Sequence, residues 1–315
     1  MTDSHKTITT QLLNFFSRLP LPVARFIGRF LAAIVNLLHV SKTSEVIRLN
    51  IEICFPHLDK QQREKLTEQA IRNEIQSYLE FFSIWGSSNQ VNIDRIHSVQ
   101  GENFFHEPIQ AGKGMVLIMP HFGTWEVMNA WLSQHTQMTI MYEPIKDEGA
   151  DHFVRTARSR ENAHLVPTDE SGVRQIFKAL KQGGTTVILP DHTPHIGGEL
   201  IEYFGIPLHS SNLSAKLIQK TKAKALFLHA KRNENHGFDL VIEPLDENIY
   251  HVNADQGTRI IFQAQERLMC QYPEHYHWSY KRFKANPALK KIYDIPKEQA
   301  ISLTNSVRVE TIAES

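Results

Sequence analysis

The sequence has only two cysteines, Cys54 and Cys270, among its 315 residues. They are too few and too far apart for a disulfide framework, so we expect a reducing, cytoplasmic environment for the main domain. Charge of one sign is not in excess either, because 34 lysines and arginines balance 34 aspartates and glutamates. A surface that binds polyanions is therefore not expected. No nucleic-acid-binding module is recognisable, so nucleic acid is excluded as a partner.

Several sequence motifs are also missing. No Gly-x-Gly-x-x-Gly or phosphate-binding loop occurs, which argues against a nucleotide cofactor. No Gly-x-Ser-x-Gly elbow occurs, which argues against a serine nucleophile. The chain has 17 histidines, but the close pairs, His192 with His195 and His275 with His277, lack a cysteine pair or a His-Glu-x-x-His helix. We therefore predict neither a cofactor nor a metal.

Long hydrophobic runs are scarce, and the nearest to one lies at the N-terminus. Residues 12–40 are rich in Leu, Phe, Ile and Ala but carry Arg18, Arg25 and Arg29. The wholly apolar run 30–35 is much shorter than the roughly 20 residues of a comfortable membrane span. No small-residue cleavage site follows, so a signal peptide is not expected. A buried helix is one interpretation; we favour a membrane anchor, either a short span or an amphipathic helix in the interface.

The strongest chemical signal lies in residues 113–126. The apolar run 115–119 has strand length and ends at a proline, and His121 follows. Thr124 is a candidate N-cap for a helix that contains Glu126. In an open α/β sheet, ligands bind where strands end and helices begin. We expect Glu126, in the first helical turn, to reach back to the His121 imidazole and orient a general base.

A second strand repeats this pattern. Residues 185–189 are followed by a proline and Asp191, so both strand ends are expected at one edge of the sheet. The sequence leaves two roles open for Asp191. It orders the His121 region, or it binds an arginine such as Arg158 from the helix predicted at 150–161. We favour an Asp191–Arg158 ion pair that turns the remaining guanidinium donors toward an anion.

The remaining periodicity predicts one α/β domain with a polar, loosely attached tail after Asn286. We expect three segments: a membrane-anchoring segment at 1–40, a catalytic domain at 41–286 and the tail at 287–315. The other predicted strands are 138–142, 224–230 and 238–243, and the other predicted helices are 41–54, 60–83, 102–110, 171–181, 211–221 and 253–272.

Four stretches, in order, resemble one known family. They are Arg48 to Pro56 (Arg-Leu-Asn-Ile-Glu-Ile-Cys-Phe-Pro), the His121-x4-Glu126 box, Leu189-Pro-Asp191 with the later Tyr-Phe-Gly-Ile-Pro207, and Tyr272 to Lys284 with its Pro-Glu-x-x-x-Trp and Arg-Phe-Lys. Together they resemble the lysophospholipid acyltransferase superfamily. Within it, they are most similar to the bacterial lipid A secondary (lauroyl/myristoyl) acyltransferases.

The resemblance implies an α/β fold with a central mixed sheet flanked by helices and one N-terminal membrane helix. It implies transfer of an acyl chain from acyl carrier protein, or as a second choice from coenzyme A, to the hydroxyl of a 3-hydroxyacyl chain on a lipid A precursor. The enzyme would lie at the cell inner membrane, with its catalytic domain on the cytoplasmic face. The residues that match are His121 and Glu126 as a general-base dyad, and Arg158, Asp191, Lys281 and Arg282 as substrate contacts.

Two positions depart from the family pattern. His192 stands where glutamine often follows the aspartate, and Glu143 stands where an arginine is common. Both departures bear on the acceptor. The alternatives are therefore an acyltransferase for another glycolipid, of the phosphatidylinositol mannoside type, and a non-catalytic membrane lipid-binding protein.

Overall fold

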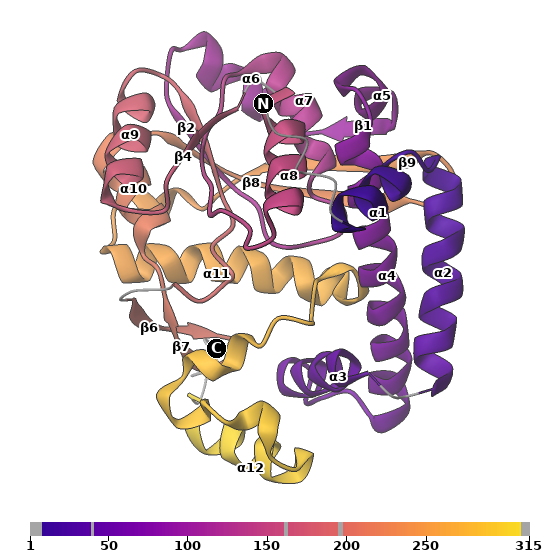
Figure 1. Cartoon of the computed structure of the whole chain (residues 1–315). Helices are drawn as coiled ribbons and strands as arrows, with labels where there is room; N and C mark the ends of the chain where they lie inside the picture. The colour runs from indigo at the N-terminus through magenta and orange to yellow at the C-terminus, as the bar shows by residue number, and fades with distance from the viewer. Residues whose placement is uncertain (1–7, 39–40, 161–162, 195–197, 310–315) are drawn as a thin grey trace.

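The computed structural model describes residues 8–38, 41–160, 163–194 and 198–309 (Figure 1). Its centre is a five-stranded sheet in the order β1-β9-β8-β2-β5, in which β2 is parallel to both neighbours and β8 is antiparallel to β9. The predicted α/β class with a mixed sheet flanked by helices is thus confirmed. The strands are β1 (Ile96–Gln100), β2 (Met115–Ile118), β5 (Thr185–Ile188), β8 (Lys224–Asn233) and β9 (Gly237–Pro244).

Strand β2 is buried on both faces, as its unbroken apolar sequence predicts. Val116 and Ile118 belong to a core cluster that also contains residues of α11 (Ala254–Gln271), α10 (Leu213–Thr221) and α9 (Glu170–Lys181). Met115 and Leu117 belong to a second cluster with residues of α6 (Glu102–Gln110) and α7 (Val127–His135). Successive side chains of a strand alternate between faces, so the sheet separates two helical layers.

Two smaller sheets extend this framework. The parallel pair β3 (Thr139–Met141) and β4 (His164–Val166) lies beside β5, because Met138 forms a bridge to Thr185. The antiparallel hairpin β6 (Glu199–Tyr203) and β7 (Ile206–Ser210) packs on α11, below the main sheet in Figure 1.

The described helices that precede β1, together with the helix before β4, form a group beside the sheet (Figure 1). The long helix α4 (Lys60–Gly86) begins with a capping box between Asp59 and Gln62. It runs alongside α2 (Leu21–Leu38) in Figure 1. The other helices here are α1 (Ile8–Ser17), α3 (Lys42–Cys54), α5 (Asn89–Asp94) and α8 (Glu148–Arg160).

Helix α2 has two different faces. By length and composition alone it is long and apolar enough to cross a membrane, which is weak evidence for a span. Its Arg25, however, is buried against the domain. Arg25 Nε lies 2.6 Å from a carboxylate oxygen of Glu80 in α4, and the guanidinium also donates to the carbonyls of Asn233 and Gly237. The outer face exposes large apolar side chains, most of all Phe26, Phe30 and Leu37. In the structure α2 is thus an amphipathic helix docked on α4.

The segment after Asn286 is well packed, contrary to the loosely attached tail expected from its polarity. Leu289 and Ile292 are fully buried, and α12 (Lys297–Val307) buries Ala300. Arg308 donates to the backbone carbonyls of Phe204 and Ile53. A few well-spaced apolar residues are enough to dock this segment, whereas residues 310–315 lie outside the described part of the chain.

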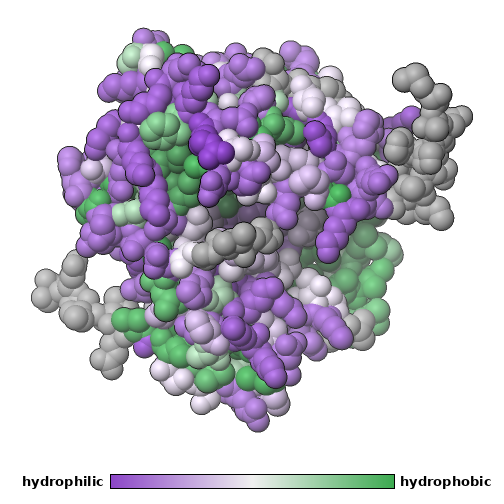
Figure 2. Space-filling view, turned by 60° about the vertical axis from the view of Figure 1, so that its left-hand side comes forward, coloured by the Kyte–Doolittle hydropathy of each residue, from purple (hydrophilic) through white to green (hydrophobic). Residues whose placement is uncertain are grey.

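The face shown in Figure 2 is largely hydrophilic, and its hydrophobic residues gather in separate patches.

Candidate active site

His121 and Asp191 meet at the carboxyl edge of the sheet. Strands β2 and β5 are parallel neighbours in which Ile118 pairs with Ile188, and each of the two polar residues lies three positions further on. Asp191 Oδ1 lies 2.9 Å from His121 Nδ1, and Oδ2 accepts the backbone N–H of His121 at 3.0 Å. The predicted convergence of the two strand ends is confirmed. Of the two roles left open for Asp191, the structure supports the first: Asp191 orders the His121 region.

The electrostatics of this pair fix the tautomer of the histidine. Burial by itself would raise the pKa of Asp191, but the adjacent His121 and its hydrogen bonds outweigh burial and hold that pKa well below its ordinary value. The ionised carboxylate also accepts the Tyr276 hydroxyl at 3.0 Å. An ionised acceptor requires a proton on Nδ1, so Nε2 of the neutral ring carries the lone pair. Because 20% of the His121 side chain is exposed, this nitrogen can receive a proton from a bound molecule.

Aromatic side chains hold the His121 ring on several sides. The His192 imidazole lies parallel to it, with ring centroids 3.8 Å apart and an interplanar angle of 5°. Tyr280 stacks on the other face of His192 at 3.7 Å. Trp125 meets His121 edge to face at 4.9 Å. Burial and the neighbouring His121 lower the pKa of His192 to about 4, so the stacked partner is neutral at pH 7.

Glu126 lies beside this group but has other partners. It occupies the N-cap position of α7, and 2% of its side chain is exposed. Its Oε1 lies 2.6 Å from Arg158 Nη2, and its Oε2 accepts from Trp85 Nε1 and Asn129 Nδ2, each at 3.1 Å. The expected hydrogen bond from Glu126 to His121 is therefore absent among the described residues.

The prediction of an ion pair between Asp191 and Arg158 is also wrong, because Arg158 pairs with Glu126. Each carboxylate contacts the residue that was predicted for the other. Asp191 follows the strand next to that of His121 and contacts His121, whereas Glu126 points toward α4 and α8 and contacts Trp85 and Arg158. Arg158 is half-buried and also lies over the Tyr142 ring at 5.5 Å. Arg155 on the same helix is more exposed.

The two basic residues predicted near the C-terminus lie in different surroundings. Arg282 is 3% exposed and donates to Ser210 Oγ at 2.6 Å and to the His209 carbonyl at 3.0 Å. In this structure it ties the closing segment to β7, and its burial does not suit a contact with a large substrate. Lys281 instead lines a cavity of about 780 Å³ together with three other cationic residues, Lys42, Arg48 and Lys297, and two carboxylates, Glu45 and Asp294.

The closing motif, residues 272–284, forms one wall of the site. The backbone N–H of Gly123 donates to the His275 carbonyl at 2.8 Å, and the N–H of His277 donates to the His121 carbonyl at 3.0 Å. Gly123 has φ of 55°, and a Cβ there would lie 2.5 Å from the Ala230 carbonyl oxygen. A glycine is thus required for the His121 loop to lie against β8.

No local sequence pattern singles out Tyr276, Tyr280 or His277 within this motif. Its resemblance to a family pattern was the only available signal, and their roles depend on contacts between residues more than 80 positions apart.

Glu80 is another residue that sequence reasoning left without a role. It is fully buried and accepts hydrogen bonds from Arg25, from Arg232 and from the Thr124 hydroxyl. Burial would raise the pKa of Glu80, but Arg232 and Arg25 outweigh it and lower the pKa. Thr124 is therefore not an N-cap: it ties the loop after His121 to α4.

A histidine oriented by a buried carboxylate at a strand end is an arrangement that can accept a proton as a general base. Among the described residues, no serine, threonine or cysteine side chain is hydrogen-bonded to His121, so the arrangement differs from a catalytic triad. The family pattern described as bacterial lipid A biosynthesis acyltransferase matches residues 7–285. The chain belongs to this family.

Individual relatives agree with this assignment. The chain is 21% identical over 279 residues to a lipid A biosynthesis palmitoleoyltransferase of Escherichia coli, covering 88% of this chain and 90% of the relative. It is 22% identical over 274 residues to the lauroyltransferase of the same organism, covering 86% and 88%. It is also 26% identical over 142 residues to a phosphatidylinositol mannoside acyltransferase of Mycobacterium tuberculosis, covering 44% of each chain.

Proposed function

We propose that this protein is an O-acyltransferase that moves a fatty acyl chain from acyl carrier protein to a hydroxyl of a 3-hydroxyacyl chain on a lipid A precursor. Family membership supports the acyl transfer and the class of acceptor. The observation that carries the chemistry is the Asp191–His121 pair, because it leaves Nε2 of His121 as a proton acceptor at the strand ends.

In the proposed reaction, His121 Nε2 takes the proton of the acceptor hydroxyl while the hydroxyl oxygen attacks the thioester carbonyl. Asp191 stabilises the imidazolium that forms. The tetrahedral intermediate collapses, the carbon–sulfur bond breaks, and the imidazolium returns the proton to the departing thiolate. General-base catalysis of this kind contributes typically 10²–10⁴-fold, so substrate positioning supplies the rest of the acceleration.

In this proposal Glu126 and Arg158 together form an anion-binding site. Glu126 holds the guanidinium, as a positioning residue, and Arg158 binds an anion, either an acceptor phosphate or the developing oxyanion. A guanidinium has five donors in a planar fork and suits either anion. Lys281, in a cavity lined by four cationic and two anionic side chains, is proposed as a second contact for a phosphate of the acceptor.

We also propose that residues 1–40 attach the enzyme to the cytoplasmic face of the inner membrane, with residues 41–286 as the catalytic part. The docked position of α2 and its exposed Phe26, Phe30 and Leu37 support an interfacial helix over a span.

The proposal is tested with a radiolabelled acyl thioester of acyl carrier protein and a lipid A precursor in detergent. Release of carrier thiol must depend on the acceptor, and the label must appear in the lipid through an ester. The phosphatidylinositol mannoside alternative has the partial similarity noted above in its favour. It predicts transfer to that acceptor and none to the lipid A precursor. A lipid-binding protein without catalysis would release no thiol with either.

A further inference from the structure

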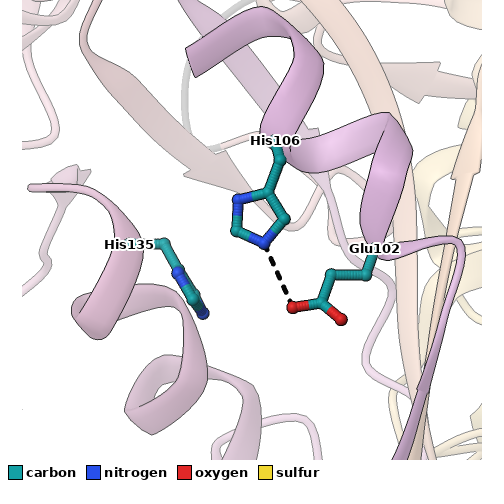
Figure 3. A group of neighbouring side chains, drawn as sticks. All are labelled: Glu102, His106 and His135. Atoms are coloured by element: carbon teal, nitrogen blue, oxygen red, sulfur yellow. Dashed lines mark hydrogen bonds and ion pairs between the residues drawn. The ribbon is translucent and has the colours of Figure 1, made fainter. Parts of the chain in front are cut away.

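A second cluster of chemically capable side chains lies away from the candidate active site. Glu102 and His106 are one turn apart on α6, and His135 faces them from the end of α7 (Figure 3). His106 Nε2 lies 3.1 Å from Glu102 Oε1, and one ligand atom from each residue falls within 4.8 Å of the others. We propose that these three side chains form a binding site for a transition-metal dication, with Zn²⁺ as its reference ion.

The donor set fits such an ion. Two imidazole nitrogens and one carboxylate oxygen are a ligand set that zinc uses in proteins, with a fourth position open to water. Metal–ligand bonds of 2.0–2.2 Å place the donors of a tetrahedral site about 3.4 Å apart. The Glu102–His106 distance already matches this separation, and Figure 3 shows all three side chains turned toward a common point. Small side-chain rotations complete the geometry.

The state of His135 supports binding. Within the described residues its ring nitrogens have no hydrogen-bond partner, so a metal ion would displace no existing contact of His135. Phe105 and Trp131 pack against the His135 ring, with centroids 6.0 and 4.5 Å from it. A hydrophobic wall of this kind limits water around a metal site.

The site is distinct from the proposed catalytic centre. Glu126 precedes the first residue of α7 and His135 is the last, so about 13 Å of helix separate them. Helix α6 leads into β2, and α7 follows the His121 loop. A metal that joins the two helices would therefore brace both ends of the segment that carries His121.

The sequence did not suggest this site because its residues lie in two groups 29 positions apart from His106 to His135, and neither group has a metal-binding motif. The proposal does not depend on the acyltransferase activity.

The test uses untagged, full-length protein freed of metal with a chelator. Zn²⁺ binding is measured by competition with a chromophoric chelator, and Co²⁺ reports the ligands through its visible absorption. We expect one equivalent to bind, and His135→Ala and His106→Ala each to weaken binding at least about tenfold. Zn²⁺ should raise the thermal midpoint of the wild type and not that of His135→Ala.

The matched control is His97→Ala, which alters a different pair of stacked histidines, His97 and His236, beside Asp239. Its Zn²⁺ affinity should equal that of the wild type. The proposal fails if the wild type binds no Zn²⁺ at micromolar concentrations, if both cluster variants bind as the wild type does, or if His97→Ala loses binding instead. Equal thermal midpoints of all variants in excess chelator establish that folding is unchanged; should His135→Ala be unstable, His106→Gln answers the same question.

Discussion

Asp191 holds His121 through two hydrogen bonds, one to the imidazole Nδ1 and one to the backbone N–H. Both residues follow parallel neighbouring strands by the same number of positions. The pair is therefore a consequence of strand register, and the proposed chemistry depends on it.

Replacement of either residue should abolish most turnover. His121→Ala removes the base, and Asp191→Asn removes the charge that stabilises the imidazolium and fixes the tautomer. We expect kcat to fall by about 10²–10⁴-fold in each. Acceptor-dependent thiol release measures this, with urea unfolding as the control for folding. A kcat within a few-fold of the wild type in either folded variant would exclude the proposed base.

The main effect of Glu126→Ala should be a lower free energy of unfolding. It leaves the half-buried Arg158 without its carboxylate and the Trp85 N–H without its acceptor. We expect a loss of about 3 kcal/mol in the free energy of unfolding, the low end for buried ion pairs because Arg158 keeps some contact with water. Urea denaturation measures this loss. A Glu126→Ala variant as stable as the wild type would show that the ion pair contributes nothing.

Arg158→Lys separates anion binding from a purely structural role. Lysine keeps the charge but loses the planar fork. We expect kcat/KM to fall by roughly tenfold or more, equivalent to about 1.4 kcal/mol of transition-state stabilisation. Arg155→Lys, at a more exposed arginine that also lies over the Tyr142 ring but is not paired with Glu126, is the matched control and should be nearly neutral. Equal kcat/KM in the two variants would remove Arg158 from the proposed site.

The stacking of His192 on His121 should affect the rate modestly. Aromatic stacking contributes about 0.5–1.5 kcal/mol, so His192→Ala should reduce kcat by about 2–10-fold. His192→Gln, which retains a planar group, should lose less. Because His192 is neutral at pH 7, neither change should remove an ionisation from the pH–rate profile between pH 6 and 8. An unchanged kcat in His192→Ala would show that the stack does not position the base.

The buried histidines predict loss of stability in mild acid. Burial lowers the pKa of His192 and His229 to about 4, and of His275 and His277 to about 3. Between pH 6.5 and these values the unfolded chain binds protons that the native protein does not, so the free energy of unfolding falls as pH falls. Each histidine contributes roughly 1.4 kcal/mol per pH unit. Glu74 opposes them, because its pKa of about 7 keeps a proton on the native carboxyl.

Urea unfolding at pH 7, 6 and 5 measures this dependence. The four histidines outnumber the two carboxyls with a raised pKa, Glu74 and Glu266, so the urea midpoint should drop steadily. His229→Gln should make the decline shallower, whereas substitution of the exposed His251 should not. Equal urea midpoints at pH 7 and pH 5 would contradict the buried, neutral state of these rings.

The membrane proposal is best tested on the outer face of α2. Phe26→Ser, Phe30→Ser and Leu37→Ser together should reduce binding to vesicles of anionic phospholipid, with stability changed by less than about 0.5 kcal/mol for each exposed site. Leu200→Ser, another exposed leucine, serves as the control. Undiminished vesicle binding by the triple variant would place the attachment elsewhere.

Deletion of residues 1–40 is a poorer test than the sequence suggests. It removes Arg25, one of the two arginines that pair with the fully buried Glu80. The truncated protein should therefore lose stability as well as membrane attachment, because an ionised group in the core would lose part of its compensation.

Local patterns in the sequence determined the main elements. The apolar run 115–119 predicted a strand, and β2, which is buried on both faces, is that strand. The proline-ended strands before His121 and Asp191 predicted a shared edge of the sheet, and parallel pairing puts them there. These predictions depend on periodicity and on short-range sterics, both of which are determined by residues close together in the chain.

The choice of partners was decided by the tertiary structure. Sequence spacing favoured Glu126 for His121 and Asp191 for Arg158, yet each carboxylate pairs with the other's predicted partner. Spacing along the chain gives the reach of a side chain but not its direction, and direction here is set by the strand register and by the packing of α4 and α8. The same holds for Arg25 with Glu80, and for Tyr276 with Asp191. Contacts between residues 55 and 85 positions apart arise only when the layers of the fold are assembled.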